Sequence, residues 1–180
     1  FAMFTTPDFD KWFSKPVTEV FDAMLENLEQ ELARNADLIT KAGSAAEIEA
    51  NHAAGKMSAV LTLEGPAGIN FDAGRLEELY DRGFRISTLS WNEQNILTGS
   101  IATGGGLTDA GREYVRECQR LGILVDVSHI SDEAFWDIMK ITEAPIVASH
   151  SNLRSVCNHS RNLTEDMYRA ICETGGTAGI

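Results

Sequence analysis

Two histidines, His129 and His150, each follow a short apolar run that is rich in β-branched residues, at 123–127 and 146–148. Such runs predict buried strands, and the helical spacing of apolar residues between them predicts a connecting helix. Parallel strands joined by a helix have their carboxyl ends at the same edge of a sheet. We therefore expect the two imidazoles to lie side by side. A pair of imidazoles at strand ends indicates a metal site more strongly than either one alone.

A carboxylate extends this predicted site. Glu64 ends an apolar strand expected over 57–63 and precedes a Gly-Pro pair. A carboxylate at that depth is costly unless it is paired or metal-bound, although an exposed loop glutamate is the alternative when the residue is taken alone. Two neutral imidazoles and one carboxylate suit Zn²⁺, with Mn²⁺, Fe²⁺ and Co²⁺ as weaker alternatives. The sequence therefore predicts that Glu64, His129 and His150 bind zinc.

Other side chains with possible chemistry fall near these strand ends. Arg161 could hold a substrate carboxylate through two parallel hydrogen bonds, or it could be a solvated arginine before a helix. Trp91 and Asn92 lie in a long loop, 90–106, at the place where substrate would enter, and loops of this length are commonly functional. Asp126 could orient a metal ligand or pair with a polar group of the neighbouring strand.

Alternating strands and helices must position these residues. We expect about six strands, at 1–5, 57–63, 84–89, 123–127, 146–148 and 176–180. We expect about six helices between them, at 16–34, from 44, at 72–81, at 108–120, after 131 and at 164–173. This rhythm is typical of a parallel α/β fold.

An open doubly wound sheet and a (β/α)₈ barrel share this rhythm. No G-x-G-x-x-G follows the first strand, and polar residues recur at strand ends, so the barrel is favoured. We predict a TIM-barrel type fold with about six of its eight βα units, because a full barrel typically has ~250 residues. Phe1 opens directly on a strand-like run and 176–180 ends in another. We therefore expect 1–180 to be a single barrel domain that is truncated at both ends.

Composition excludes several classes of function. The net charge of the 180 residues is −12 and no basic cluster stands out, so nucleic acid is not an expected partner. No apolar run approaches the ~20 residues of a membrane span, and no signal peptide is visible. The 3 cysteines are odd in number and widely spaced, which indicates a reducing, cytoplasmic location without a disulfide framework.

Five segments resemble sequences of the membrane dipeptidase (renal dipeptidase) family, and they occur in the same order. They are LTLEG at 61–65, GFRISTLSWNEQN at 83–95, GLTDAGREYVRECQRLGILVDVSHIS at 106–131, PIVASHSNLRSVCNHSRNLT at 145–164 and GGTAGI at 175–180. The resemblance implies a (β/α)₈ barrel with a binuclear zinc centre. It implies that Glu64 is a catalytic carboxylate bridging both metals, and that His129 and His150 bind the second metal. It further implies that Arg161 holds the carboxyl terminus of a dipeptide.

The chain also departs from the family pattern. It lacks the His-x-Asp pair that the family's first metal uses and the catalytic aspartate of a DFDG-like phrase. Renal-type members have a substrate-binding histidine where this chain has Trp91 or Asn92. We therefore expect dipeptide hydrolysis by a metal-bridging hydroxide in a complete barrel, and little or no activity in this chain alone. A homodimer is left open. The alternatives are another barrel metallohydrolase that acts on amide or ester bonds, and a non-catalytic binding remnant of the barrel.

Overall fold

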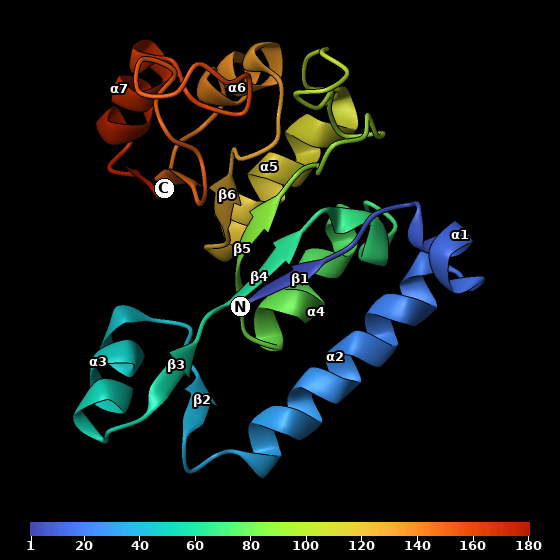
Figure 1. Cartoon of the computed structure of the whole chain (residues 1–180), viewed down its shortest axis with the longest axis vertical. Helices are drawn as coiled ribbons and strands as arrows, with labels where there is room; N and C mark the ends of the chain where they lie inside the picture. Colours follow the sequence, from blue (N-terminus) through green and yellow to red (C-terminus); the bar gives the residue numbers. More distant parts are fainter.

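The main sheet of the protein has six parallel strands, which a computed structural model describes together with the rest of residues 1–180 (Figure 1). They are β1 (Ala2–Phe4), β4 (Leu61–Glu64), β5 (Phe84–Thr88), β6 (Leu124–Asp126), β7 (Ile146–Ala148) and β8 (Thr177–Ala178). Their spatial order follows their order along the chain, so each strand adds to the same side of the one before it. A doubly wound sheet would reverse direction at a switch point, and this sheet does not. The expected barrel-type order is therefore confirmed.

The edges of this sheet show how much of a barrel is present. β1 pairs only with β4, and β8 pairs only with β7, so the six strands do not close on themselves. A complete barrel of this type has eight strands. The sheet therefore corresponds to six consecutive strands of an incomplete parallel barrel.

Helices connect the strands, and α3 packs on the separate strand β3 (Met57–Ala59) and not on the main sheet. They are α1 (Phe9–Phe13), α2 (Val17–Arg34), α3 (Ala45–Ala53), α4 (Leu76–Asp81), α5 (Asp109–Leu121), α6 (Asp132–Met139) and α7 (Glu165–Glu173). Two short 3₁₀ helices, η1 (Pro66–Ile69) and η2 (Ala73–Arg75), follow β4. The hydroxyls of Ser44, Thr108, Ser131 and Thr164 each accept a hydrogen bond from a backbone N–H in the first turn of α3, α5, α6 and α7. These caps explain why the four helices begin where the sequence predicted.

The long helix α2 shows how the apolar pattern produces packing. Phe21, Leu25 and Leu28 recur at helical spacing and are buried in one cluster with residues of the strands. Directly after α4, Arg82 donates two hydrogen bonds to the carboxylate of Glu29 in α2, at 3.2 and 3.1 Å. This ion pair links the end of α4 to α2.

The strand expected over 57–63 is wrong as a single element. β3 (Met57–Ala59) pairs with β2 (Ile39–Lys41) in a separate two-stranded parallel sheet, and the chain enters the main sheet only at β4. With α3, these two strands form the unit at the lower left of Figure 1. Both halves of 57–63 are apolar enough for a strand, so composition could not show that they pair with different partners. The short aromatic helix α1 was not predicted either.

The carboxyl ends of the main strands face the loops that form the candidate site. The loop 90–106 is fastened there by isolated bridges that pair Thr98 with Leu107 and Ser100 with Ile130. Beneath the loops, 30 buried residues form one continuous hydrophobic cluster. No helix of the chain combines the length and the apolar character needed to cross a membrane.

Candidate metal centre

Three potential metal ligands meet at the carboxyl edge of the sheet. Glu64 ends β4, His129 follows β6 and His150 follows β7. Glu64 Oε1 lies 3.3 Å from His129 Nε2 and 3.8 Å from His150 Nε2, and the two Nε2 atoms are 2.8 Å apart. All three ligand atoms lie within 4.8 Å of one another. The side chains therefore converge as the strand-end argument predicted, while their role as ligands stays a prediction.

The outer nitrogen of each imidazole has an oxygen partner. His129 Nδ1 is 3.2 Å from Asn92 Oδ1, and His150 Nδ1 is 2.7 Å from Ser149 Oγ. An acceptor at Nδ1 favours the proton there and leaves the lone pair of Nε2 directed at the centre.

The donor set fits zinc. Ligands placed ~2.0–2.2 Å from a tetrahedral zinc ion lie about 3.3–3.6 Å from one another. The Glu64, His129 and His150 separations of 2.8–3.8 Å bracket this value. Without a proton or a cation between them, two Nε2 lone pairs and a carboxylate oxygen would repel one another. A metal ion at this point would satisfy all three.

The local electrostatics also favour the forms that bind metal. The contact with His129 Nε2, which donates a hydrogen bond when the ring is protonated, holds the pKa of Glu64 below its ordinary value, although partial burial acts in the opposite direction. Burial lowers the pKa of His150 below its ordinary value. Metal binding requires an ionised carboxylate and a neutral imidazole. Both shifts therefore act in the direction of metal binding.

Special backbone conformations position two of these ligands. Gly65, directly after Glu64, has a φ of +79°, and a Cβ atom there would lie 2.2 Å from the carbonyl oxygen of Thr5. His129 has a φ of +74°, a region that costs non-glycine residues about 1–3 kcal/mol. The carbonyl of His129 accepts a hydrogen bond of 2.8 Å from the N–H of Ile101, which holds this turn in place. Unfavourable backbone at a candidate ligand is consistent with a functional constraint.

Arg161 lies at the rim of the site as a half-buried cation. Its guanidinium makes only long contacts, 3.4 Å to Ser151 Oγ and 3.5 Å to the carbonyl oxygen of His150, and the carboxylates of Asp126 and Glu64 act on it through charge without forming an ion pair with it. Burial lowers the pKa of Arg161. A partly desolvated arginine without an acidic partner is suited to binding an anion.

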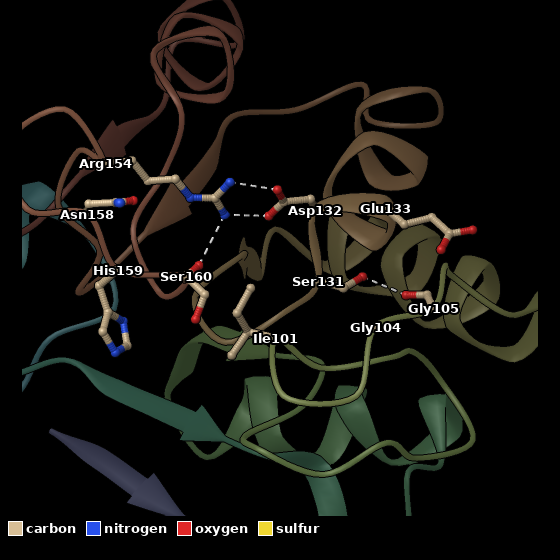
Figure 2. Close-up of a pocket in the computed structure, with 10 residues that line it drawn as sticks. All are labelled: Ile101, Gly104, Gly105, Ser131, Asp132, Glu133, Arg154, Asn158, His159 and Ser160. Carbon is tan, nitrogen blue, oxygen red and sulfur yellow. Dashed lines mark hydrogen bonds and ion pairs between the residues drawn. The ribbon is translucent and has the colours of Figure 1, made fainter.

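A second arginine, Arg154, has a different environment (Figure 2). It donates hydrogen bonds of 2.7 and 2.6 Å to the two carboxylate oxygens of Asp132 and one of 3.1 Å to the carbonyl of Ser160. This pair ties the first turn of α6 to the segment that contains Arg161. The pair borders a polar pocket of about 450 Å³, which His159 also lines but which none of the three candidate ligands lines. Arg154 is therefore a neutralised structural residue, and His159 is exposed.

The remaining predicted residues lie around the histidines. The ring of Trp91 is 6.3 Å from that of His129 and 4.8 Å from that of Phe4, between centroids. Asn92 is exposed, and its Oδ1 contacts His129 while its Nδ2 has no protein partner. Nothing in the structure tests whether either residue binds substrate.

Sequence reasoning missed one contact and left another open. The hydroxyl of Ser149, which was not among the predicted site residues, contacts the ring of His150. Asp126 bonds the neighbouring strand, because its Oδ1 accepts from the backbone N–H groups of Ser128 (2.9 Å) and Ser149 (3.0 Å). A serine immediately before a histidine at a strand end was the available signal.

Comparisons with known proteins show which family and which solved structures the chain resembles. The family model described as "Membrane dipeptidase (Peptidase family M19)" matches residues 1–180. A metallopeptidase from Rhodobacter sphaeroides, solved with a phosphinate mimic of the dipeptide L-Ala-D-Ala, is 29% identical with a TM-score of 0.87 over 99% of this chain and 59% of its own. The solved dipeptidase AC, of family M19, is 31% identical with a TM-score of 0.85 over 99% of this chain and 57% of its own.

A curated relative shows the same partial coverage. The Klebsiella pneumoniae protein described as "Uncharacterized protein in pqqA 5'region" is 34% identical over 161 residues, which are 85% of this chain and 59% of that protein. The chain thus spans little more than half the length of these relatives.

Proposed function

The chain belongs to the membrane dipeptidase family, peptidase family M19, and on that premise we propose that it serves zinc-dependent hydrolysis of dipeptides. We propose further that residues 1–180 act as a single metallodipeptidase barrel domain. The observation that supports this most directly is the convergence of Glu64, His129 and His150 within 4.8 Å at the carboxyl edge of a barrel-type sheet. That edge is where the active sites of barrel enzymes lie.

Each candidate residue has a role in this proposal. His129 and His150 hold zinc through Nε2, and Glu64 holds it through a carboxylate oxygen and serves as the catalytic carboxylate. Zinc, when bound, supplies a hydroxide nucleophile at neutral pH and polarises the scissile carbonyl. These three side chains fix the metal position relative to the rim.

The rim residues position the substrate. Arg161 receives the terminal carboxylate, since its guanidinium has no acidic partner in the protein. This would restrict the substrate to very short peptides. The free Nδ2 of Asn92 donates to a substrate oxygen, and Trp91 forms an apolar wall beside His129.

The three ligands account for one metal ion. The sequence contains no His-x-Asp pair for the binuclear centre that the family resemblance implies. We therefore propose that the 180-residue chain binds one zinc ion and hydrolyses dipeptides slowly or not at all, because losing one member of a concerted site can remove most of the rate.

Metal stoichiometry tests the proposal. The purified chain is loaded with Zn²⁺, dialysed and analysed by elemental analysis and by titration calorimetry. We expect one zinc per chain, lost in Glu64→Gln and His129→Ala. His52→Ala removes an exposed histidine of α3 and is the matched control, which should retain the metal. Zinc binding that survives both ligand substitutions, or is lost equally in the control, would contradict the assignment.

Activity assays then separate dipeptide hydrolysis from the alternatives. Dipeptides, cyclic amides and simple esters are compared as substrates of the zinc-loaded chain. Turnover of cyclic amides or esters in preference to dipeptides would favour another barrel metallohydrolase. Rapid dipeptide hydrolysis by this chain would show that the essential groups are all present here and that the expected weak activity is wrong.

The cellular setting is a smaller part of the proposal. We propose a cytoplasmic location, which the three free cysteines support because disulfides are rare in reducing compartments. The homodimer stays a prediction.

A further inference from the structure

A buried carboxylate lies behind the ring of His150. Asp126 is 3% exposed. Its Oδ1 accepts from the N–H groups of Ser128 (2.9 Å) and Ser149 (3.0 Å), and its Oδ2 accepts from the hydroxyl of Ser149. These three donors fix the carboxylate between the ends of β6 and β7. The position of Asp126 is therefore determined before any ligand arrives.

The direction of these hydrogen bonds determines which nitrogen of His150 has the proton. Ser149 has one hydroxyl hydrogen, and it points at Asp126 Oδ2. Toward His150 Nδ1, at 2.7 Å, Ser149 Oγ can therefore only accept. The proton must be on Nδ1, and the lone pair of Nε2 then points at Glu64 and His129. Neutral histidine in water favours the opposite tautomer, so the protein has to impose this one.

We propose that Asp126, acting through Ser149, is a positioning residue that fixes the tautomer and orientation of His150 for metal binding. This inference rests on the proposed function, because it concerns the same metal site. His129 is held separately by Asn92 Oδ1, at 3.2 Å from its Nδ1. Such outer partners commonly affect metal affinity by about 10- to 100-fold.

Asp126 also ties two strand ends together, so its removal alone could not separate positioning from structure. Ser149→Ala removes only the link to the ring, and Ser149 is exposed, so the fold should tolerate the change. Ser149→Thr keeps the hydroxyl and should behave as the unaltered protein. Ser128→Ala is the control: Ser128 Oγ accepts from the backbone N–H of His150 (3.3 Å) and lies 3.5 Å from Ser149 Oγ, but it contacts neither the ring of His150 nor the carboxylate of Asp126, so Asp126, Ser149 and His150 all keep their mutual contacts.

Asp126→Asn gives a more specific expectation than simple loss. The amide oxygen must replace Oδ1, since that position accepts from two backbone N–H groups. The amide NH₂ group then replaces Oδ2 and donates to Ser149 Oγ. The hydroxyl hydrogen of Ser149 turns toward His150 Nδ1, and the ring proton moves to Nε2. This substitution should reverse the tautomer with almost no change of shape.

The test is ¹⁵N NMR of the histidine side chains in the metal-free chain, at a pH where the imidazoles are neutral, followed by zinc titration against a chelator. We expect the Nδ1–H form of His150 in the unaltered chain, in Ser149→Thr and in Ser128→Ala. We expect the Nε2–H form to predominate in Asp126→Asn and to increase in Ser149→Ala. Both of these variants should bind zinc about 10- to 100-fold more weakly.

The two readouts separate failure of this inference from failure of the proposed function. If His150 keeps the Nδ1–H form in Asp126→Asn and Ser149→Ala, or if Ser128→Ala shifts it equally, the positioning role is wrong, whatever the zinc affinity. A tautomer that changes as expected while zinc affinity stays within twofold also overturns the role in metal binding. If the tautomers follow the expectation but no variant, including the unaltered chain, binds zinc, the proposed function fails.

Discussion

Arg161→Ala should weaken dipeptide binding to the zinc-loaded chain and leave folding almost unchanged. The guanidinium is half-buried and makes two long contacts, 3.4 Å to Ser151 Oγ and 3.5 Å to the carbonyl of His150. Losing two such contacts costs little, and removing a cation whose pKa burial has lowered offsets part of that cost. We therefore expect the free energy of unfolding to change by less than about 0.5 kcal/mol.

The effect on binding follows from the position of the charge. Opposite unit charges ~4 Å apart attract by about 1 kcal/mol in water and about 4 kcal/mol near a protein surface of effective dielectric constant ~20. The half-buried Arg161 lies between these limits, so a substrate carboxylate should gain about 2–3 kcal/mol. At 1.4 kcal/mol per tenfold, Arg161→Ala should raise Kd roughly 30- to 150-fold. Arg161→Lys should recover only part, because an ammonium cannot replace two parallel N–H donors.

The assay is titration calorimetry with a dipeptide and with the corresponding dipeptide amide. The amide has no carboxylate, so it should bind weakly to the unaltered chain and lose little further in the variant. Arg116→Ala removes an exposed arginine of α5 and controls for the change in net charge. If the acid and the amide lose the same binding free energy on Arg161→Ala, there is no coupling to the carboxylate. Arg161 would then be structural.

Three further predictions concern stability and reactivity. Burial raises the pKa of Glu93, whose carboxylate oxygens have no hydrogen-bond partner. The protonated side chain therefore favours the folded state: its contribution to the free energy of unfolding is fully present below the ordinary pKa of 4.5 and is lost as pH rises through the higher folded pKa. Glu93→Gln should therefore raise the urea-measured free energy of unfolding at pH 7 by about 1 kcal/mol and change it little at about pH 4; equal effects at both pH values would contradict this. The hydrogen bond from Arg82 lowers the pKa of Glu29 below 4.5. The ionised Glu29 therefore stabilises the folded state at pH values above 4.5, and this stabilisation is lost as pH falls through the lower folded pKa. Because the pair is partly exposed, Glu29→Gln should cost only about 0.5–1 kcal/mol at pH 7, and an undiminished cost at about pH 3 would count against the pair. Burial raises the pKa of the Cys118 thiol, and Cys118 is fully buried, so a thiol reagent should titrate only the two exposed cysteines until the chain is denatured.

Much of the fold was predictable because the helical spacing of apolar residues and the positions of the N-cap hydroxyls indicate the same helices. The stripe of Phe21, Leu25 and Leu28 predicted α2, and the hydroxyls of Thr108 and Thr164 marked the starts of α5 and α7. The division of 57–63 into β3 and β4 was not predictable in the same way. It depends on β2, a strand about twenty residues away, and apolar composition does not specify a partner.

The candidate site was likewise predictable only in part. Strand ends predicted the convergence of Glu64, His129 and His150, because parallel strands in sequence order bring their carboxyl ends to one edge. The positive φ of His129 and the contact of its ring with Asn92 depend on how a long loop folds back over β6. Loop conformation arises from tertiary contacts that leave no periodic signal in the sequence.

The two Ser-His dipeptides are equivalent in the sequence but not in the structure. Ser128 is fully buried and accepts from the backbone N–H of His150, while Ser149 contacts the ring of His150, so both serines support the same histidine. His129 obtains its partner from Asn92 instead. The two imidazoles therefore depend on different elements, one on the ends of β6 and β7 and the other on the loop 90–106. Substitutions in that loop should therefore affect His129 first, and they reach His150 only through the contact between the two Nε2 atoms, which are 2.8 Å apart.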